Sequence, residues 1–383
     1  MSAKGAGRIA SGHPWIFASD VQDRGTAEPG DAVRVVDPKR RFLGIAHYSS
    51  TSQICLRLLT TREEPIDAAF FRRRIKQALA YRQRVVADSD AYRVVFGEAD
   101  LLPGLVIDRY ADCVVLQTLD QGMERARDTI AGCVREWLDP RAIVLRNDVA
   151  VRERESLPLE KAVLFGEAPV RPQIRMNGLA FDTDLMEGQK TGVYLDQREN
   201  YLAAGRHARG RVLDCFTSSG GFAMHAARSA EHVIAVDSSA PALALARTNA
   251  SLNGIERIDF READVFDLLA AAAHGRETYS MVILDPPAFA KSRGSVEGAA
   301  RGYKEINLRA LRLLGPGGIL VTCSCSHHVS EAMLLGIVAE ASLDAGRTLR
   351  VIERRTQAAD HPILLTVPET LYLKCLVLEV VGS

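Results

Sequence analysis

The segment LVTCSCSHHV, residues 320–329, brings four chemically reactive side chains close together. Cys323 and Cys325 are two residues apart, and His327 and His328 follow almost directly. Thiols and imidazoles can bind zinc, and a thiol can also form a disulfide or act as a nucleophile. A run of aliphatic residues precedes the segment, which predicts that the cysteines lie at the end of a buried strand. The chemistry of the segment therefore depends on what the rest of the chain places beside it.

The spacing argues against a metal site and against a disulfide in this segment. Structural zinc sites usually space their ligand pairs further apart and take the second pair from another segment, and no second Cys/His pair is evident in the sequence. A disulfide between residues two apart has poor geometry in a strand. A purely structural strand end remains an alternative to a nucleophile. The two histidines could lower the pKa of a thiol or cap the next helix, and we favour the cap.

Composition and charge set the broad class of the protein. The 48 basic and 48 acidic residues balance, so only a local patch could attract nucleic acid or a membrane. Seven cysteines are an odd number scattered over 383 residues, which favours free thiols in a reducing cytoplasm. We see no apolar segment typical of a signal peptide or of a membrane span. The sequence therefore predicts a cytoplasmic, globular protein.

Hydrophobic patterning divides the chain into three expected domains, covering residues 1–64, 65–171 and 172–383. Short strand patterns at 31–37, 39–49 and 52–60 predict a small β-barrel-like module. Residues 65–86 have helical spacing; strand patterns over 92–119, a helix at 124–138 and a strand at 142–148 follow, which predicts a small α/β domain. Residues 151–170 are charged and contain proline, which suits a linker or an exposed connection. From about residue 172, strands and helices alternate, which favours a doubly wound parallel sheet.

Three carboxylates end successive strands of this last region. Asp214, Asp237 and Asp264 are expected at the edge of the sheet where ligands of such folds bind. A glycine turn, Gly220–Gly221, opens the helix after the first of these strands and lets a ligand approach the backbone. The turn lacks the pattern G-x-G-x-x-G, so a pyrophosphate is not indicated.

Acidic strand ends suit a nucleoside without phosphates. Asp237 could accept the ribose hydroxyls and Asp264 the adenine amino group, so S-adenosylmethionine fits better than NAD or ATP. The alternative is that these aspartates are helix caps. The helix over 240–253 carries its own cap signals, with Ser238 or Ser239 at its start, Pro241 in its first turn and Gly254 at its end.

The segment ILDPPAF, residues 283–289, has the most specific pattern in the sequence. Two consecutive prolines after a strand-end aspartate make a stiff, extended turn. Such a turn could hold Asp285 and Phe289 against a planar base, with Pro286 and Pro287 beside it. A proline-rich loop without function is the alternative.

Four segments in this order resemble the RlmI-like family of 23S ribosomal RNA cytosine-C5 methyltransferases: residues 188–200, 212–227, 285–289 and 323–328. Residues 12–21 resemble the start of that family's PUA domain, so the resemblance spans nearly the whole chain. It implies an N-terminal PUA β-barrel that binds RNA, a small α/β middle domain and a C-terminal class I, Rossmann-like methyltransferase sheet. Ser218 and Ser219 precede the glycine turn where the family often has an aromatic residue and threonine. The resemblance also implies a site for the cofactor S-adenosylmethionine. The residues expected to bind it are Asp214, Phe216, Ser219, Gly220, Gly221, Asp237, Asp264 and Asp285.

Methylation at C5 of cytosine needs a nucleophile. A thiolate that adds to C6 converts the ring to an enamine, and C5 can then attack the methyl group. The family's Ser-Cys-Ser motif aligns on Ser324, Cys325 and Ser326, so the resemblance implies that Cys325 is the nucleophile and that Asp285 contacts the base. Cys323 and Cys325 would share a face of a strand, so geometry alone leaves both open, but Cys323 lies nearer the strand interior and suits packing.

Basic clusters are the expected contacts with RNA phosphates. The helix over 71–86 carries six basic residues and no acid, including Arg72, Arg73 and Arg74, and residues 39–41 form a second cluster. A solvated helix face explains the first cluster equally well. Lys190 and Gln197 are further substrate contacts that we expect near the mouth of the active site.

Two other functions compete with a cytosine-C5 methyltransferase. The first is methylation of N2 of guanine or N6 of adenine, whose enzymes use an Asp/Asn-Pro-Pro-aromatic motif and no thiol; Ala288 interrupts that motif here. The second is a non-catalytic RNA-binding ribosome assembly factor, against which the intact acidic strand ends argue. We expect large-subunit ribosomal RNA as substrate, no membrane partner, and a homodimer as a further hypothesis.

Overall fold

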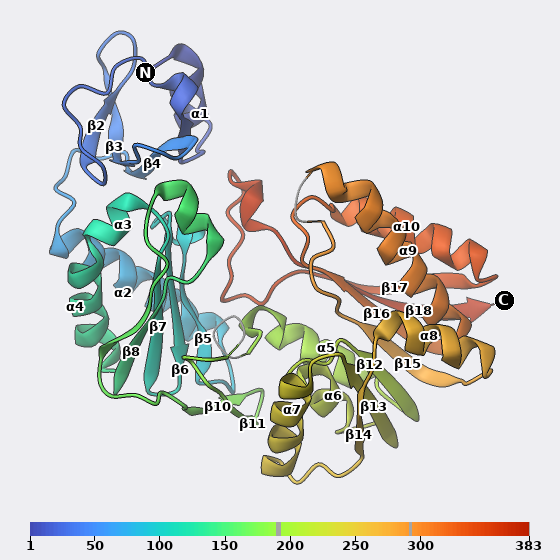
Figure 1. Cartoon of the computed structure of the whole chain (residues 1–383). Helices are drawn as coiled ribbons and strands as arrows, with labels where there is room; N and C mark the ends of the chain where they lie inside the picture. Colours follow the sequence, from blue (N-terminus) through green and yellow to red (C-terminus); the bar gives the residue numbers. More distant parts are fainter. Residues whose placement is uncertain (189–192, 291–292, 383) are drawn as a thin grey trace. The chain divides into compact units, whose positions relative to one another are not determined.

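The computed structural model describes residues 1–188, 193–290 and 293–382 of the chain. Two compact units account for these residues, and each is described by itself. The first unit comprises residues 1–178, 183–195 and 359–370, and the second comprises 179–182, 196–358 and 371–383. The chain therefore passes between the units several times (Figure 1).

The N-terminal part of the first unit is a four-stranded antiparallel sheet. Helix α1 (Ala3–Ala10) begins after Ser2, whose hydroxyl accepts a hydrogen bond from the Gly5 amide. The expected short strands are present, and their order in the sheet is β1-β4-β3-β2. The strands are β1 (Trp15–Phe17), β2 (Ala32–Val36), β3 (Phe42–Tyr48) and β4 (Ile54–Thr60). Ile16 and Ala46 are fully buried at the centre of a small core of this sheet.

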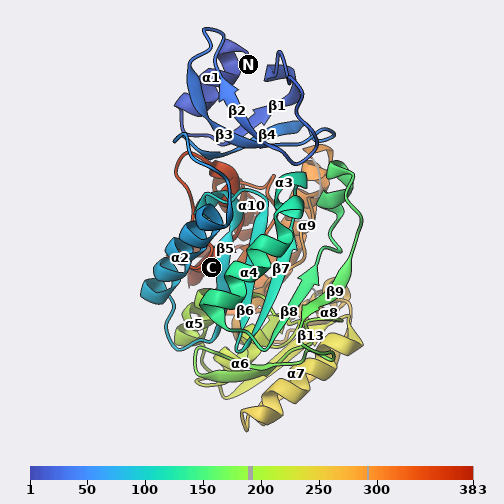
Figure 2. The ribbon, with the colours of Figure 1, turned by 90° about the vertical axis from the view of Figure 1, so that its left-hand side faces the viewer.

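A five-stranded mixed sheet forms the rest of the first unit's core, with the order β5-β6-β7-β8-β9. Helices α2 (Ala68–Val85) and α4 (Arg127–Leu138) cover one face of it (Figure 2). The short helix α3 (Gln121–Arg125) precedes α4. The strands are β5 (Ala91–Phe96), β6 (Leu105–Tyr110), β7 (Cys113–Thr118), β8 (Ala142–Arg146) and β9 (Lys161–Phe165). Apart from β9 and the short helix α3, these elements match the expected helices and strands of this region.

The prediction of a linker at residues 151–170 is wrong. This segment contains a 3₁₀ helix (Ala150–Glu155) and strand β9, which pairs with β8. Two of its charged residues are buried and paired: Arg152 contacts Glu124 at 2.9 Å, and Glu155 contacts Arg57 at 2.7 Å. Glu153, Arg154, Lys161 and Glu167 are exposed. Composition suggested a solvated segment because a local pattern does not show ion pairs between residues far apart in the sequence, such as those of Arg152 and Glu155.

The second unit is built on a seven-stranded sheet in the order β14-β13-β12-β15-β16-β18-β17. All seven of its strands were expected as one parallel series, and β12, β13, β14, β15 and β16 do run parallel. The strands are β12 (Arg211–Cys215), β13 (His232–Asp237), β14 (Ile258–Glu262), β15 (Tyr279–Leu284), β16 (Leu314–Ser324), β17 (Thr348–Arg355) and β18 (Lys374–Gly382). Strand β11 (Leu179–Asp182) also belongs to this unit, whereas β10 (Gln173–Met176) belongs to the first.

The sheet departs from the expected parallel arrangement at one edge. Strand β18 lies between β16 and β17 and is antiparallel to both. The described chain has no α-helix between β17 and β18, and a parallel connection needs a crossover that is usually a helix. The chain therefore returns in the opposite direction, and the sheet is mixed.

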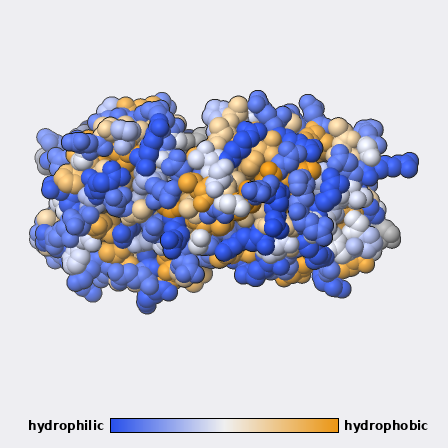
Figure 3. Space-filling view, turned by 90° about the horizontal axis from the view of Figure 1, so that it is seen from below, coloured by the Kyte–Doolittle hydropathy of each residue, from blue (hydrophilic) through white to orange (hydrophobic). Residues whose placement is uncertain are grey.

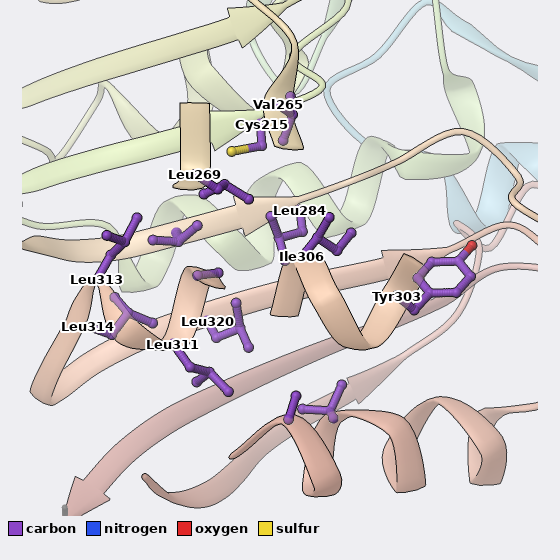
Figure 4. Packing of buried hydrophobic residues seen from close by; sticks show 14 of the residues in the cluster. Cys215, Val265, Leu269, Leu284, Tyr303, Ile306, Leu311, Leu313, Leu314 and Leu320 are labelled. Carbon is purple, nitrogen blue, oxygen red and sulfur yellow. The ribbon is translucent and has the colours of Figure 1, made fainter. Parts of the chain in front are cut away.

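Helices lie on both faces of this sheet, as a doubly wound fold requires (Figure 1). One face packs on α8 (Val265–His274), α9 (Val296–Arg312) and α10 (Glu331–Asp344). Leucine, isoleucine and valine side chains fill this layer, and Figure 4 shows Leu284, Ile306 and Leu320 facing one another. The other helices are α5 (Arg198–His207), α6 (Gly221–Ala226) and α7 (Ala240–Leu252).

The hydropathy of the surface is that expected of a globular protein. Hydrophilic residues predominate on the face shown in Figure 3, and hydrophobic residues are scattered among them. Within the ranges described above, no helix is long and apolar enough to span a membrane.

Candidate active site

Asp237 ends strand β13 and fixes the loop that follows β12. Its Oδ2 accepts a hydrogen bond from the Ser218 amide at 2.9 Å, and its Oδ1 accepts one from the Ser239 amide at 2.9 Å. Helix α7 does not need Asp237 as its cap, because the Ser239 hydroxyl accepts the Ala242 amide. The carboxylate therefore joins two loops at the edge of the sheet where a ligand of this fold binds.

The turn between β12 and α6 has an unusual backbone. Phe216 and Ser218 have φ angles of 65° and 49°, and Gly220 has a φ of 87°. Residues other than glycine rarely adopt such angles, and two of them with a glycine in one five-residue turn are a feature found at functional sites. A Cβ atom on Gly221 would lie 2.4 Å from Cζ of Tyr201, so close packing of that ring requires glycine here. The Asn249 side-chain amide holds the turn by donating to the Ser219 carbonyl at 3.0 Å.

Asp214 is fully buried at the end of β12. Its Oδ2 accepts a hydrogen bond of 2.6 Å from the Thr217 hydroxyl, and its Oδ1 has no hydrogen-bond partner in the described part of the chain. Burial raises the pKa of this carboxyl to about 7, and the carboxylates of Asp285 and Asp237 add to the effect against the hydrogen bond from Thr217. Asp237 and Asp285 therefore lie close enough to Asp214 to act on it, and Asp264, the third acidic strand end expected from the sequence, is not among these groups.

The raised pKa of Asp214 predicts a loss of stability as the pH rises. The carboxyl binds a proton more tightly in the folded chain than in the unfolded one, whose pKa is about 3.9. The contribution of this carboxyl to the free energy of unfolding is therefore fully present below about pH 4 and is lost as the pH rises towards 7. Asp214→Asn should remove this slope, which reaches at most about 1.4 kcal/mol per pH unit. Urea unfolding of both proteins between pH 4 and 8 measures the difference, and parallel curves would contradict the prediction.

Asp264 is in part a helix cap, as the alternative interpretation proposed. Its Oδ1 accepts the amides of Phe266 and Asp267 at 2.8 and 3.2 Å, and the residue precedes helix α8. The carboxylate is exposed, and its Oδ2 makes no further hydrogen bond to the residues that the structure describes. A contact with adenine stays a prediction.

The segment DPPAF follows strand β15, which ends at Leu284. Pro286 is buried, and Pro287 is exposed. The ring of Phe289 lies 4.8 Å from that of Tyr303 and 6.1 Å from that of Phe266, so part of this side chain packs on the core. The contacts of Asp285, Pro286, Pro287 and Phe289 with a substrate base stay predictions.

Cys325 differs from every other cysteine of the chain by its exposure. Strand β16 ends at Ser324, and Cys325 is the first residue beyond it. It is partly exposed, whereas the six other cysteines are buried. Cys323 lies inside the strand, opposite Cys375 in the register of β16 with β18, and both thiols are free. Burial raises the pKa of the Cys323 thiol well above its usual range. Only Cys325 therefore combines accessibility with a place at the ligand-binding edge of the sheet.

Tyr303 of helix α9 holds the loop around Cys325. Its hydroxyl contacts Oγ of Ser324 at 2.9 Å and Oγ of Ser326 at 3.1 Å, which are the residues on both sides of the cysteine. The Ser326 hydroxyl also accepts the Ala290 amide at 3.3 Å, which links the loop to the end of DPPAF. Figure 4 shows the Tyr303 hydroxyl pointing away from the labelled aliphatic side chains.

Tyr303→Phe should lower the turnover number without changing the affinity for the cofactor. The variant keeps the buried ring but loses two hydrogen bonds, each with a net value of about 1 kcal/mol, that hold the cysteine loop. Steady-state kinetics and calorimetric titration of the cofactor measure the two quantities separately. A weaker affinity with an unchanged turnover number would contradict this role.

The histidines do not cap the next helix, so that prediction is wrong. Ser330 is the N-cap of α10, and its hydroxyl accepts the Met333 amide at 3.1 Å. His327 and His328 are exposed in the turn before it, and the His327 ring lies 5.7 Å from the Tyr372 ring. Serine at 330 has the ordinary cap chemistry and was available in the sequence. In the described ranges, no group of three or more His, Cys, Asp or Glu residues could hold a metal ion.

Of the two substrate residues expected in 188–200, only Gln197 lies within the described residues. Lys190 lies outside them. Gln197 is 2% exposed, and its Oε1 accepts the Asn200 side-chain amide at 2.7 Å. Its side chain also acts on Cys323 and lowers the pKa of that thiol against the effect of burial, which favours support of the strand end over direct contact with a substrate.

The basic helix α2 has acidic partners from other elements. Arg72 pairs with Glu136 at 2.8 Å, and Arg73 pairs with Glu64 at 2.7 Å. Arg74 is half-buried, which lowers its pKa, and it donates to a backbone carbonyl. The absence of acid within residues 71–86 therefore did not mean an unpaired basic face. Binding of RNA phosphates by these arginines stays a prediction.

Comparisons with known proteins bear on both units. A profile of PUA-like domains matches residues 1–61, and a profile described as S-adenosylmethionine-dependent methyltransferase matches residues 146–377, which is more than half of the chain. The chain is 43% identical over 379 residues to the ribosomal RNA large subunit methyltransferase I of Tolumonas auensis, covering 96% of both proteins. It is 42% identical over 378 residues to the protein of the same name from Shewanella denitrificans, covering 96% of this chain and 95% of that one.

A solved structure with the same fold carries the product of a methyl donor. It is SMU.776, described as a putative methyltransferase complexed with SAH. Its TM-score with this chain is 0.84 at 20% identity, and the match covers 99% of this chain and 98% of that one. At this identity the likeness concerns the fold. The α/β architecture with an N-terminal PUA-like part and a Rossmann-like methyltransferase sheet is thereby confirmed.

Proposed function

Because this chain belongs to the ribosomal RNA large subunit methyltransferase I family of S-adenosylmethionine-dependent methyltransferases, we propose that it methylates C5 of a cytosine in large-subunit ribosomal RNA. The observation that carries the choice of C5 is Cys325. It is the one partly exposed cysteine of the chain and lies at the end of β16, the strand beside the one that precedes Asp285. Methylation of an exocyclic amine would need no thiol at this place.

The residues at the edge of the sheet fit S-adenosylmethionine. Asp237 closes the β12–α6 loop, and the buried Oδ1 of Asp214 has no partner among the described residues, so both can interact with polar groups of a ligand. The positive φ of Gly220 leaves the helix start open to a close approach. We propose that Asp214, Phe216, Ser219, Gly220, Gly221, Asp237, Asp264 and Asp285 line the cofactor site. The bound cofactor supplies an electrophilic methyl group.

The chain's own residues perform the covalent steps. The thiolate of Cys325 adds its electron pair to C6 of the cytosine, and C5 becomes the nucleophilic carbon of an enamine. Asp285 in its protonated form donates a hydrogen bond to N3 and accepts one from the amino group, which stabilises the negative charge that develops on the ring during the addition. With S-adenosylmethionine bound, C5 would take its methyl group as the bond from that carbon to the donor sulfur breaks. A base then removes the C5 proton, and the electrons of that C–H bond expel the Cys325 thiolate. Serines 324 and 326, held by Tyr303, orient the thiolate for addition and elimination.

The rest of the chain positions the RNA. The PUA-like part and the basic clusters, including Arg72, Arg73 and Arg74, are the proposed contacts with the ribosomal RNA backbone, together with Lys190, Gln197, Pro286, Pro287 and Phe289 nearer the base. The expected division at residues 64 and 171, a cytoplasmic location and a homodimer are parts of this proposal. Mass measurement in solution tests the homodimer.

Mass mapping of modified nucleosides tests the function. Large-subunit ribosomal RNA from cells without the protein is incubated with the purified chain and S-adenosylmethionine that carries a CD₃ group, then digested to nucleosides. We expect labelled 5-methylcytidine, and a reaction without protein is the control. Labelled N2-methylguanosine or N6-methyladenosine would support the rival methyltransferase instead. The same RNA presented as naked transcript and as ribosomal particle identifies the preferred substrate.

A further inference from the structure

Lys374 places an ammonium group beside the loop that carries Cys325. It is the first residue of β18 and lies opposite Ser324, the last residue of β16. Its side chain is buried, and its Nζ donates to the Ser326 carbonyl at 2.7 Å and to the Tyr372 carbonyl at 2.9 Å. Lys374 therefore adjoins the residues on both sides of Cys325: it lies opposite Ser324 in the strand register, and it donates a hydrogen bond to Ser326.

The charge of this buried ammonium lacks a carboxylate partner. Within the described residues, no Asp or Glu oxygen lies within 4.0 Å of Nζ, and both of its hydrogen bonds go to neutral carbonyls. A buried charge without a counter-ion is costly. Burial accordingly lowers the pKa of Lys374 to about 8, and the opposite charge of Cys325 is the one influence that raises it. The thiol of Cys325 is thus the acidic group whose charge acts on this ammonium.

We propose that Lys374 is the positioning residue of the nucleophile: it stabilises the Cys325 thiolate by its charge and fixes the loop through the Ser326 carbonyl. The inference rests on the proposed function, in which that thiolate adds to C6. A neighbouring ammonium increases the fraction of thiolate at neutral pH. Lys374 keeps its own proton throughout, and the proton of the thiol goes to solvent, so Lys374 takes no part in bond making.

The other titratable groups near the cysteine do not supply this charge. Tyr303 of α9 interacts with Cys325, but burial raises the pKa of its hydroxyl, so it is neutral at pH 7. Asp285, in the segment after β15, acts on the adjacent Cys323 and would oppose a thiolate. His327 is an exposed neighbour in the turn and stacks near Tyr372. Lys374 is therefore the buried cation of this site.

Alkylation of Cys325 without RNA or cofactor tests the inference on the full chain. Iodoacetamide reacts with thiolates, and the six other cysteines are buried, so the labelled peptide identifies the reaction at Cys325. The rate is measured from pH 6 to 10 in the wild-type protein. We expect a midpoint below about 8.5, the usual value of a cysteine. A wild-type midpoint at or above that value overturns the proposal without the use of any variant.

Two substitutions separate charge from hydrogen bonding. Lys374→Gln keeps a donor for the carbonyls but removes the charge, and it should raise the midpoint by about one unit and slow alkylation at pH 7 about tenfold. Lys374→Arg keeps the charge and should restore most of the rate. Near pH 10 the three proteins should react alike. A rate reduced equally at every pH would indicate a structural role and contradict the proposal.

The control is Lys304→Gln, which removes another lysine of the same unit. Lys304 pairs with Glu340 and Asp344 at the surface, so its loss should leave the midpoint of Cys325 unchanged. Failure of the proposed function has a different signature. If the protein without the Cys325 thiol still methylates RNA, the C5 mechanism is wrong, whereas the alkylation midpoints still decide whether Lys374 controls the thiol.

Discussion

Cys325→Ala should abolish methyl transfer, lowering the rate by about 10⁴-fold or more. The loss is large because the substitution removes the atom that forms the covalent bond to C6, and the remaining residues cannot make C5 nucleophilic. Binding of S-adenosylmethionine should change little, since Cys325 lies beyond β16 and the proposed cofactor residues follow β12 to β15. Transfer of a tritiated methyl group to ribosomal RNA and calorimetric titration of the cofactor measure the two quantities.

The matched variant is Cys323→Ala, two residues earlier in the same strand. Cys323 is fully buried against Cys375, so its loss leaves a small cavity and should cost about 1 kcal/mol of stability with little loss of rate. Full activity of Cys325→Ala would refute covalent catalysis and favour a methyltransferase of exocyclic amines. Loss of activity only in Cys323→Ala would assign the nucleophile to the other thiol.

Asp237→Ala should weaken the binding of S-adenosylmethionine by about 100-fold or more. The substitution removes both hydrogen bonds that fix Ser218 and Ser239, together with the proposed contact with the ribose hydroxyls. Hydrogen bonds to a charged group have net values of about 1.5–3 kcal/mol, and about 2.7 kcal/mol corresponds to 100-fold in affinity. Calorimetric titration of the cofactor measures the dissociation constant.

Asp259→Ala is the control for the loss of a carboxylate from the same sheet. Asp259 lies in the neighbouring strand β14 and pairs at the surface with Arg261 at 2.8 Å, away from the loops that follow the strands. Its removal should leave the dissociation constant unchanged. If the two variants bind the cofactor equally well, Asp237 does not hold the ribose.

Local patterns were sufficient to predict the framework of the fold. Helix α7 begins and ends where Ser239, Pro241 and Gly254 predicted, because capping depends on the chemistry of adjacent residues. The glycine turn and the acidic strand ends could also be recognised, since each lies within a few residues of a strand with a clear apolar pattern. The acidic strand ends also indicated the cofactor, and the resemblance, through residues 323–328, added the reaction.

Several features depended on contacts between distant residues and could not be predicted in this way. The antiparallel insertion of β18 follows from a connection without a helix, and no local pattern in residues 374–382 gives its direction. The basic residues of α2 and the buried Arg152 find their acidic partners 9 to 64 residues away. Burial and pairing change the role of a charge, but they are properties of the tertiary structure.

The sequence by itself determined that this protein has a doubly wound sheet with acidic strand ends and a cysteine pair beside them. The local sequence pattern did not determine which of Cys323 and Cys325 is accessible. The end of β16 at Ser324 decided that, because it leaves Cys325 outside the strand and Cys323 packed against Cys375. The register of β18 then placed Lys374 beside the loop, a contact across 48 residues that depends on strand pairing rather than on sequence proximity.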